Sequence, residues 1–357
     1  MASGFYDHDS LSAFEAISQA QKIAFAPMLF QAALSLRDLG VLEFLDGRKE
    51  EGATLKEISD HTGLDGYAAG VLVDMGLSAN IIYLSEGTYR LSKIGFFILH
   101  DRMTAVNMNF TADVCYQGMA SLSDSLKNGR PEGLRVFGSW PSIYPHLRDL
   151  PPRARQSWFA FDHFYSDACF KSALPHVFRL GPSLIYDLGG NTGRFAVSCC
   201  AHDSKVRVTI LDLGGQIEMA RENIKEQGLE GRVDFRAVDI LDSGAELPGD
   251  ADVWWMSQFL DCFSEEQVIG ILGAVRSAMH DDARVCIMEP FWDYQKFEAI
   301  SYSLNASSLY FTAMANGRSR FFSRDTFLGY LDRAGLSPED QIENLGVCHT
   351  LLVCVKK

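Results

Sequence analysis

The sequence predicts an α/β protein with a mainly parallel, Rossmann-like sheet in its C-terminal half and a winged helix near its start. From about residue 183, strand-like apolar runs alternate with helical segments, which implies a parallel sheet covered on both faces. Residues 54–92 read as helix, turn, helix and hairpin. The 357 residues, 47% of them hydrophobic, can fill several cores. We expect domains at residues 1–100, 101–180 and 181–357.

Helical periodicity and turn residues define the N-terminal region. Apolar residues recur at helical spacing over residues 25–45, and Gly40 is the expected stop. Thr54 and Glu57 match a capping box that opens the next helix. The remaining expected elements are a helix at residues 54–61, a helix at 66–77, and strands at 81–85 and 88–92.

The charge of this region argues against DNA binding. Residues 52–95 hold three basic and five acidic side chains, and the second helix, residues 67–77, holds no Lys or Arg. A helix that enters the major groove needs cations for phosphates and donors for base edges. The net charge of the chain, 32 − 46 = −14, also opposes nucleic acid and anionic membranes as partners. We therefore expect this apolar helix to pack against another subunit.

Cysteine usage and the apolar runs indicate a cytoplasmic protein. The eight cysteines form no C-x-x-C pair and show no metal-finger spacing, so we expect reduced thiols and no metal site. No apolar run approaches the ~20 residues that span a bilayer. The first residues lack the basic and apolar segments of a secretory signal.

Residues 101–180 are helical and rich in aromatic residues, and they are expected to link the two halves and cover a pocket. The catalytic half follows. Its expected strands are residues 184–188, 206–211, 233–238, 251–256 and 284–288, with a closing hairpin at 341–345 and 349–355. Its expected helices are residues 216–227, residues 265–280 and one capped by Ser323. Ligands of such sheets bind at the carboxyl ends of the strands.

The first expected strand runs directly into a glycine-rich turn that holds Gly189, Gly190 and Gly193. Glycines let the backbone approach a ligand closely, and they leave the N-terminus of the following helix accessible to that ligand. Asp212 ends the second strand, 19 residues beyond Gly193, where a carboxylate accepts from both ribose hydroxyls. Asp239 ends the third strand and can receive an adenine amine. Together these residues predict an adenosine site.

The glycine register separates the possible adenosine cofactors. A nicotinamide dinucleotide would require glycine at position 188, which is Leu188. The pattern here is D-x-G-G-x-x-G, led by Asp187. S-adenosylmethionine has no pyrophosphate to cradle, and Asp187 can lie near its ammonium group. Ile240, Met256 and Gln258 adjoin the strand ends and complete the expected cofactor contacts.

Three stretches resemble the S-adenosylmethionine-dependent small-molecule O-methyltransferases, which include plant caffeic acid and hydroxyindole enzymes and bacterial tailoring enzymes. They are residues 187–193, residues 252–267 (DVWWMSQFLDCFSEEQ) and residues 287–290 (IMEP). The resemblance covers nearly the whole chain. It implies a class I methyltransferase sheet, an S-adenosylmethionine cofactor, and an N-terminal domain that forms a homodimer and helps to wall the neighbouring pocket.

The same resemblance implies the position of the catalytic base. The family reads H-D-W-S-D-E after its fourth strand, and the histidine is the general base. Asp261 stands at that histidine position here, and Glu289 matches the glutamate that orients the base. Ser319 stands where the family has a second such glutamate.

An ordinary aspartate is a weak base for a phenol. Because the usual pKa values in water are roughly 10 for a phenol and 3.9 for an aspartate, the proton transfer is uphill by about 8 kcal/mol. Three solutions remain open: Asp261 and Glu289 form a coupled pair with a raised pKa, the acceptor is unusually acidic, or Asp261 only orients the acceptor. His163, His146 and His100 are the other candidate bases.

The pocket is predicted to be aromatic, which suits a flat acceptor. Its candidate residues are Phe161, Tyr165, Phe259, Phe291, Tyr310, Phe311 and Met314.

The leading hypothesis is methyl transfer from S-adenosylmethionine to a small aromatic or conjugated hydroxylated metabolite, with a homodimer as the assembly. O-methylation is favoured, and carbon methylation ortho to a phenol is possible because a phenolate is nucleophilic there too. A second hypothesis keeps the cofactor in a reaction without methyl transfer. A third, a metabolite-sensing regulator, is opposed by the helix without cations.

Overall fold

The structure is a computed structural model that describes residues 4–357, so the first three residues of the expected N-terminal domain lie outside the described residues. The chain divides into two compact units. Residues 6–111 form one unit, and residues 112–357 form almost all of the other.

The first unit contains the predicted order of helix, turn, helix and hairpin. Thr54 and Glu57 form the predicted capping box, since each side chain accepts from the backbone N–H of the other residue. Gly40 adopts a left-handed conformation and separates two helices, as expected of a stop signal. The elements are α1 (Ala13–Ala24), α2 (Ala26–Asp38), α3 (Val41–Arg48), α4 (Leu55–Thr62), α5 (Gly66–Ser78), β1 (Ile82–Ser85), β2 (Thr88–Leu91), α6 (Lys93–His100) and α7 (Arg102–Phe110).

Apolar residues of this unit divide between a core and an exposed set. The core includes Leu36, Leu42 and Val73, whose side chains are fully buried. The exposed set lies largely at the start of the unit, on and just after α1: Phe14 is 85% and Ile23 75% exposed. Large exposed apolar side chains at such density mark a surface that another protein covers.

The second unit begins with helical segments that precede the sheet. The longest is α9 (Pro152–Phe178), and it carries the aromatic run predicted from the sequence. Shorter helical segments lie before it: η2 (Thr111–Cys115), η3 (Gly118–Ser121), α8 (Leu122–Asn128), η4 (Glu132–Val136) and η5 (Tyr144–Asp149).

A seven-stranded sheet forms the centre of this unit, with strand order β5-β4-β3-β6-β7-β9-β8. The first five strands are parallel, and β9 joins β7 and β8 in antiparallel pairs. The predicted mainly parallel sheet with a closing hairpin is therefore confirmed. The strands are β3 (Leu184–Leu188), β4 (Arg207–Asp212), β5 (Val233–Ala237), β6 (Val253–Ser257), β7 (Arg284–Pro290), β8 (Leu336–Leu345) and β9 (His349–Lys356).

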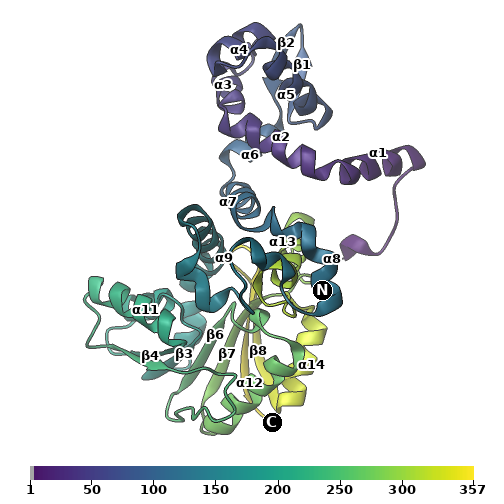
Figure 1. Cartoon of the computed structure of the whole chain (residues 1–357). Coiled ribbons are helices and arrows are strands. Elements are labelled where there is room, and N and C mark those ends of the chain that lie inside the picture. Colours follow the sequence, from purple (N-terminus) through teal and green to yellow (C-terminus); the bar gives the residue numbers. More distant parts are fainter. Residues whose placement is uncertain (1–3) are drawn as a thin grey trace. The chain divides into compact units, whose positions relative to one another are not determined.

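Helices cover both faces of the sheet (Figure 1). On one face, α9, α10 (Arg194–His202) and α11 (Gly214–Glu226) pack on inward side chains such as Ile185. On the other face, α12 (Glu265–Ala278) and α14 (Arg324–Ala334) pack on side chains such as Tyr186. The central strands β3 and β6 bury nearly every residue, so their sequences are almost entirely apolar.

The edge strand β8 begins at Leu336, five residues before its expected start. Its pairing with β9 runs from Leu336 opposite Lys356 to Leu345 opposite His349, with two irregularities. Glu339 and Asp340 interrupt the apolar pattern, because one side of an edge strand faces water. The strand is stabilised by pairing with β9, which local periodicity does not reveal.

The topology determines where the ligand crevice lies. β3 has β4 on one side and β6 on the other, so the chain changes direction across the sheet at β3. A crevice opens outside the carboxyl ends of strands at such a switch point. The ends of β3, β4, β5 and β6, with the loops that follow them, hold the residues predicted to bind a cofactor.

Among residues 4–357, no helix is both long enough and apolar enough to cross a bilayer. All eight cysteines carry free thiols, and seven of them are buried.

Candidate active site

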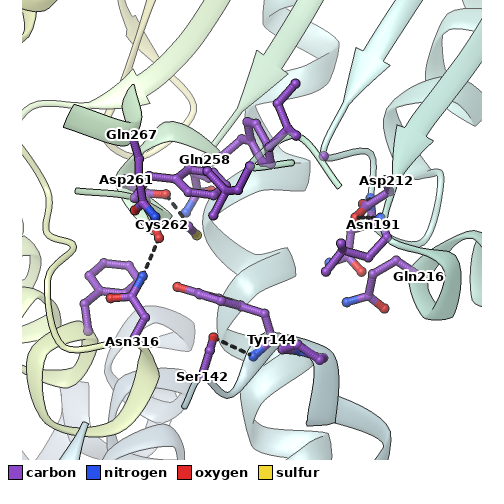
Figure 2. Close-up of a pocket in the computed structure, with 18 of the residues that line it drawn as sticks. Ser142, Tyr144, Asn191, Asp212, Gln216, Gln258, Asp261, Cys262, Gln267 and Asn316 are labelled. Atoms are coloured by element: carbon purple, nitrogen blue, oxygen red, sulfur yellow. Dashed lines mark hydrogen bonds between the residues drawn. The ribbon is translucent and has the colours of Figure 1, made fainter. Parts of the chain in front are cut away.

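A cavity of about 650 Å³ opens at the carboxyl ends of β3, β4 and β6. This volume is typical of small-molecule sites. Figure 2 shows Asp212, Asn191 and Gln216 at one end of the cavity and Asp261 and Cys262 at the other. The cavity therefore has two chemically different ends, here called the ribose end and the acceptor end.

The glycine-rich turn after β3 supports the ribose end. Gly189 has a φ of +75°, which favours glycine, and its N–H donates to the carbonyl of Leu211 at 2.9 Å. A Cβ on Gly189 would lie 2.1 Å from Cδ2 of Phe259, and one on Gly190 would lie 2.7 Å from Oδ2 of Asp187. A side chain at either position would therefore clash with Phe259 or Asp187. Glycine avoids the clash and leaves the backbone of the turn accessible to a ligand. Gly193 precedes α10 with a φ of +80°.

Asp212 is held in place by backbone donors. The N–H of Asn191 donates to its Oδ2 at 2.8 Å, and the N–H of Leu213 donates to its Oδ1 at 2.7 Å. Burial raises the pKa of Asp212 to about 6. Asp239 and Ile240 line the same cavity, as predicted for the adenine side.

Buried polar atoms without partners gather beside this turn. Within the described residues, Oδ2 of Asp187, Oδ1 of Asn191, Oγ1 of Thr192, Oγ of Ser257 and Oε1 of Gln258 have no hydrogen-bond partner. All five residues line a small pocket next to the cavity. Buried polar atoms without hydrogen-bond partners destabilise the folded protein unless a bound ligand supplies the partners. A polar, charged amino-acid group fits here, and an adenosine fits beside Asp212, so the residues suit S-adenosylmethionine.

The electrostatics of this pocket predict a pH-dependent affinity for S-adenosylhomocysteine. Burial, and then the nearby charge of Asp212, raise the pKa of Asp187 to about 8. A cationic ammonium favours the ionised carboxylate, so binding releases a proton wherever the free protein holds one. We expect the affinity to rise from pH 5.5 to pH 8, by up to tenfold per unit. Calorimetry in two buffers of different ionisation enthalpy measures the proton release, and an affinity independent of pH would contradict this assignment.

The acceptor end is built around Asp261 in η6 (Leu260–Cys262). Glu289, at the end of β7, accepts the N–H groups of Phe259 and Leu260 on Oε1 at 3.0 and 2.9 Å. These bonds attach the start of the loop that carries Asp261 to the end of β7. The Sγ of Cys262 lies 3.4 Å from Oδ1 of Asp261 and donates to it. The main chain enters this loop through Gln258, which has a φ of +45°.

The pKa values of the two carboxyl groups are both raised. Burial raises the pKa of Glu289 well above its usual range, and the charge of Asp261 adds to the effect. Burial raises the pKa of Asp261 to about 7, against the lowering by the Cys262 thiol. Proton transfer from a phenol to Asp261 is then uphill by about 3 pKa units, or roughly 4 kcal/mol, instead of about 8. The charge of Asp162, and not that of Glu289, adds to the raised pKa of Asp261, so the coupling of Asp261 to Glu289 stays a prediction.

The candidate histidine bases are engaged elsewhere. His100 Nε2 lies 2.9 Å from Oδ2 of Asp46 in the first unit, and His146 Nδ1 lies 2.9 Å from Oδ2 of Asp149. His163 borders the small pocket between two aspartates. None of these three histidines lines the cavity.

Four of the predicted aromatic residues line the cavity: Phe161, Phe259, Tyr310 and Phe311. Tyr310 Oη accepts from the indole N–H of Trp158 at 2.7 Å, which fixes two rings of the wall.

Three other predicted pocket residues and the predicted cofactor residue Met256 do not reach the cavity wall. Phe291 packs against Phe327 in the core under α14, with ring centroids 5.4 Å apart. Met256 is fully buried in the same core, because its strand position points to that face. Met314 lies against the backbone at Gly118, and Tyr165 packs behind Phe161. Their apolar character reflects packing.

Several wall residues were absent from the sequence-based set. They are polar or come from loops without periodicity: Ser142, Tyr144, Asp162, Gln216, Cys262, Gln267, Asn316 and Arg318. Asn316 donates to the carbonyl of Cys262 at 2.5 Å and accepts from the Ser319 hydroxyl at 2.8 Å. Ser319 thus supports the acceptor end through Asn316. The resemblance at residues 316–320 was the signal that could have indicated this loop.

Within residues 4–357, no group of three or more His, Cys, Asp and Glu side chains is arranged to hold a metal ion.

Comparison with known proteins gives two family matches. A family model described as an O-methyltransferase domain matches residues 120–337. A second, described as a Dimerisation2-like domain, matches residues 18–89.

Curated relatives and solved structures match over most of the chain. The L-tyrosine C(3)-methyltransferase of Streptomyces lavendulae is 22% identical over 321 residues, covering 89% of this chain and 86% of that protein. The 3-amino-4-hydroxybenzoate 4-O-methyltransferase of Streptomyces cremeus is 23% identical over 78% of this chain and 74% of that protein. The apo structure of the S-adenosylmethionine-dependent methyltransferase SibL aligns with a TM-score of 0.73 at 23% identity, covering 95% of this chain and 99% of that one.

Proposed function

The chain belongs to the O-methyltransferase domain family and is an S-adenosylmethionine-dependent methyltransferase, and we propose that it methylates a hydroxylated aromatic metabolite at the acceptor end of the cavity. When bound, S-adenosylmethionine supplies an electrophilic methyl group on a positively charged sulfur. The residues proposed to hold it are Asp187, the turn at Gly189 and Gly190, Asp212 and Asp239.

The observation that carries the proposal is the position of Asp261, a buried carboxyl group in the cavity wall at the end opposite Asp212. Burial raises its pKa to about 7. A group with this pKa can accept a phenolic proton at neutral pH and pass it on to solvent. Glu289 acts as a positioning residue through its bonds to the loop before Asp261. The aromatic wall orients a flat acceptor and excludes water.

The test is transfer of label from methyl-labelled S-adenosylmethionine to a panel of phenols, naphthols and aromatic amino acids. Labelled small-molecule product supports the proposal. Binding of the cofactor with no product from any acceptor would instead support a family member that does not transfer methyl. A salt-dependent shift of a specific DNA duplex would support a regulator.

The methylated atom is proposed to be oxygen, and an ortho carbon is the second candidate. A relative that matches 89% of this chain is named for methylation of a ring carbon of tyrosine, and Asp261 stands at the family histidine position. Both products require a phenolate, so the same residues serve both reactions. The ultraviolet spectrum of the product separates them, since a carbon-methylated phenol still ionises at high pH.

A carboxylate on the acceptor is also proposed. Tyrosine and aminohydroxybenzoate, which name two relatives, both carry one. Arg318 lines the cavity, and its Nε donates to the carbonyl of Gly129 at 3.2 Å. Its charge is among the causes that lower the pKa of the exposed Glu266. Its remaining N–H groups suit a carboxylate of the acceptor.

We expect Arg318→Gln to weaken binding of 4-hydroxybenzoate to the protein with S-adenosylhomocysteine by about tenfold, the effect of one charge-assisted bond of roughly 1.5 kcal/mol. The affinity for 4-hydroxybenzamide should change less than twofold. Arg320→Gln is the matched control, because Arg320 is exposed and does not line the cavity. Equal losses for both ligands would remove Arg318 from carboxylate recognition.

The assembly is proposed to be a homodimer formed through the N-terminal unit. The Dimerisation2-like match and the exposed apolar side chains fall in the same region, including Ile23 and Met28. Burial of these side chains against a second copy would remove them from water. Light scattering of the purified chain measures the mass, and Ile23→Asp is expected to shift it toward the monomer.

A further inference from the structure

One polar side chain at the acceptor end has no role in the reaction described so far. Tyr144 begins η5, in the segment before α9, and lines the cavity. Its hydroxyl oxygen is fully buried, and the thiol of Cys262, a weak hydrogen-bond partner, lies beside it. A buried phenol with only a thiol beside it loses most of the hydrogen bonding that it had in water.

The surroundings of this hydroxyl are those of the proposed reaction. In Figure 2 the Tyr144 ring extends across the cavity toward the end formed by Asp261, Cys262 and Asn316. Cys262, Tyr310 and Asp261 are near enough to influence its ionisation. Asn316 is already bonded to the carbonyl of Cys262, whereas the Tyr144 hydroxyl can turn its proton from the weakly accepting Cys262 thiol to the oxygen of a bound ligand.

Resting on the proposed function, we propose that the Tyr144 hydroxyl donates a hydrogen bond to the acceptor oxygen while Asp261 takes the proton from that oxygen. The O–H bond of the acceptor breaks, its proton forms an O–H bond on the Asp261 carboxylate, and the electron pair stays on the acceptor oxygen. The negative charge then lies opposite the Tyr144 donor. No oxidant or other co-reactant is needed.

The protonation states of the surrounding groups are consistent with this role. Burial raises the pKa of Tyr144 well above its usual value, so its hydroxyl stays a donor across the working pH range. Burial does the same for the thiol of Cys262 and the phenol of Tyr310. Glu289 and Asp162 also have raised pKa values through burial. Burial raises the pKa of Asp261 to about 7, so this carboxyl group ionises near neutral pH.

The proposed function of Tyr144 depends on the charge of the acceptor and not on the shape of the acceptor. A donor aimed at a developing phenolate stabilises the ionised acceptor more than the neutral one. A ring that only forms a wall would contact both equally. Two ligands of the same shape, of which only one carries the oxygen, distinguish these two possibilities.

The test compares 4-nitrophenol with 4-nitrotoluene, which replaces the oxygen by a methyl group. Both are titrated into the protein saturated with sinefungin, whose ammonium group replaces the sulfonium methyl of the cofactor. The absorbance of 4-nitrophenolate near ~400 nm reports the ionisation of the bound phenol. We expect Tyr144→Phe to weaken binding of 4-nitrophenolate by at least tenfold, the loss of one hydrogen bond to a charged group, and to weaken 4-nitrotoluene by less than twofold.

Tyr294→Phe is the control, because its hydroxyl bonds to Glu343 outside the cavity. The inference would be overturned by equal losses for the two ligands, by no loss, or by failure of 4-nitrophenol to bind the wild type. Its failure is distinct from that of the proposed function. If labelled methyl is transferred but Tyr144→Phe shows no selective loss of 4-nitrophenolate binding, only the role of Tyr144 is rejected. If the selective loss occurs but no labelled product forms, only the methyl transfer is rejected.

Discussion

Replacement of Asp261 by asparagine is expected to lower kcat for a phenolic acceptor by about 100-fold, within the usual range for loss of a general base. Asparagine keeps the size of the side chain but cannot take the proton. The wild-type rate at saturating cofactor should rise with pH through about 7, where Asp261 ionises. The variant should lack this rise. Initial rates from pH 5.5 to pH 9 measure both effects.

The variant should fold and bind the cofactor normally. A buried carboxyl group whose pKa is raised in the folded state stabilises the protein at low pH. This stabilisation is lost as the pH rises through the raised pKa. Asparagine removes this loss, so the melting temperature above pH 7 should not fall. Asp281→Asn, at the surface beside Lys356, is the matched control. An unchanged kcat and pH profile in Asp261→Asn would exclude Asp261 as the base.

Asp212→Ala is expected to weaken binding of S-adenosylhomocysteine by about 100-fold. The substitution removes the two carboxylate oxygens proposed to accept the ribose hydroxyls, and hydrogen bonds to a charged group contribute roughly 1.5 kcal/mol or more each. It also leaves the N–H groups of Asn191 and Leu213 without their acceptor. Calorimetry measures the affinity.

Asp234→Ala is a suitable control on the adjacent strand β5, because Asp234 pairs with Arg207 at the surface. Its affinity for S-adenosylhomocysteine should match the wild type. Asp212→Asn should lie between wild type and alanine, since it keeps one oxygen. A wild-type affinity in Asp212→Ala would show that the cofactor is held elsewhere.

The sequence allowed most of the fold to be predicted because its local signals agree with its tertiary contacts. The capping box predicted at Thr54 is formed, and the central strands β3 and β6 are almost entirely apolar, as expected of buried parallel strands. Strand β8 shows the limit of such signals. Its start at Leu336 depends on pairing with β9, a contact that leaves no local pattern.

The cofactor end of the site was easier to anticipate than the acceptor end. Asp212 and the glycine turn follow strands, and strand ends in a parallel sheet converge on one edge. Tyr144 and Arg318 lie in segments without periodicity, so only the folded chain brings them to the cavity. Phe291 and Met256 show the opposite error, because an apolar residue near a strand end has the same composition whether it faces a pocket or the core.

The proposed methyl transfer requires that this chain holds an adenosine cofactor at the carboxyl ends of β3 and β4. Titration of S-adenosylhomocysteine into the purified wild-type protein at pH 8 tests it most directly. We predict a saturating heat signal with one site per chain. Absence of binding heat at several temperatures, with the protein folded by circular dichroism, would contradict the claim and the methyl transfer inferred from it.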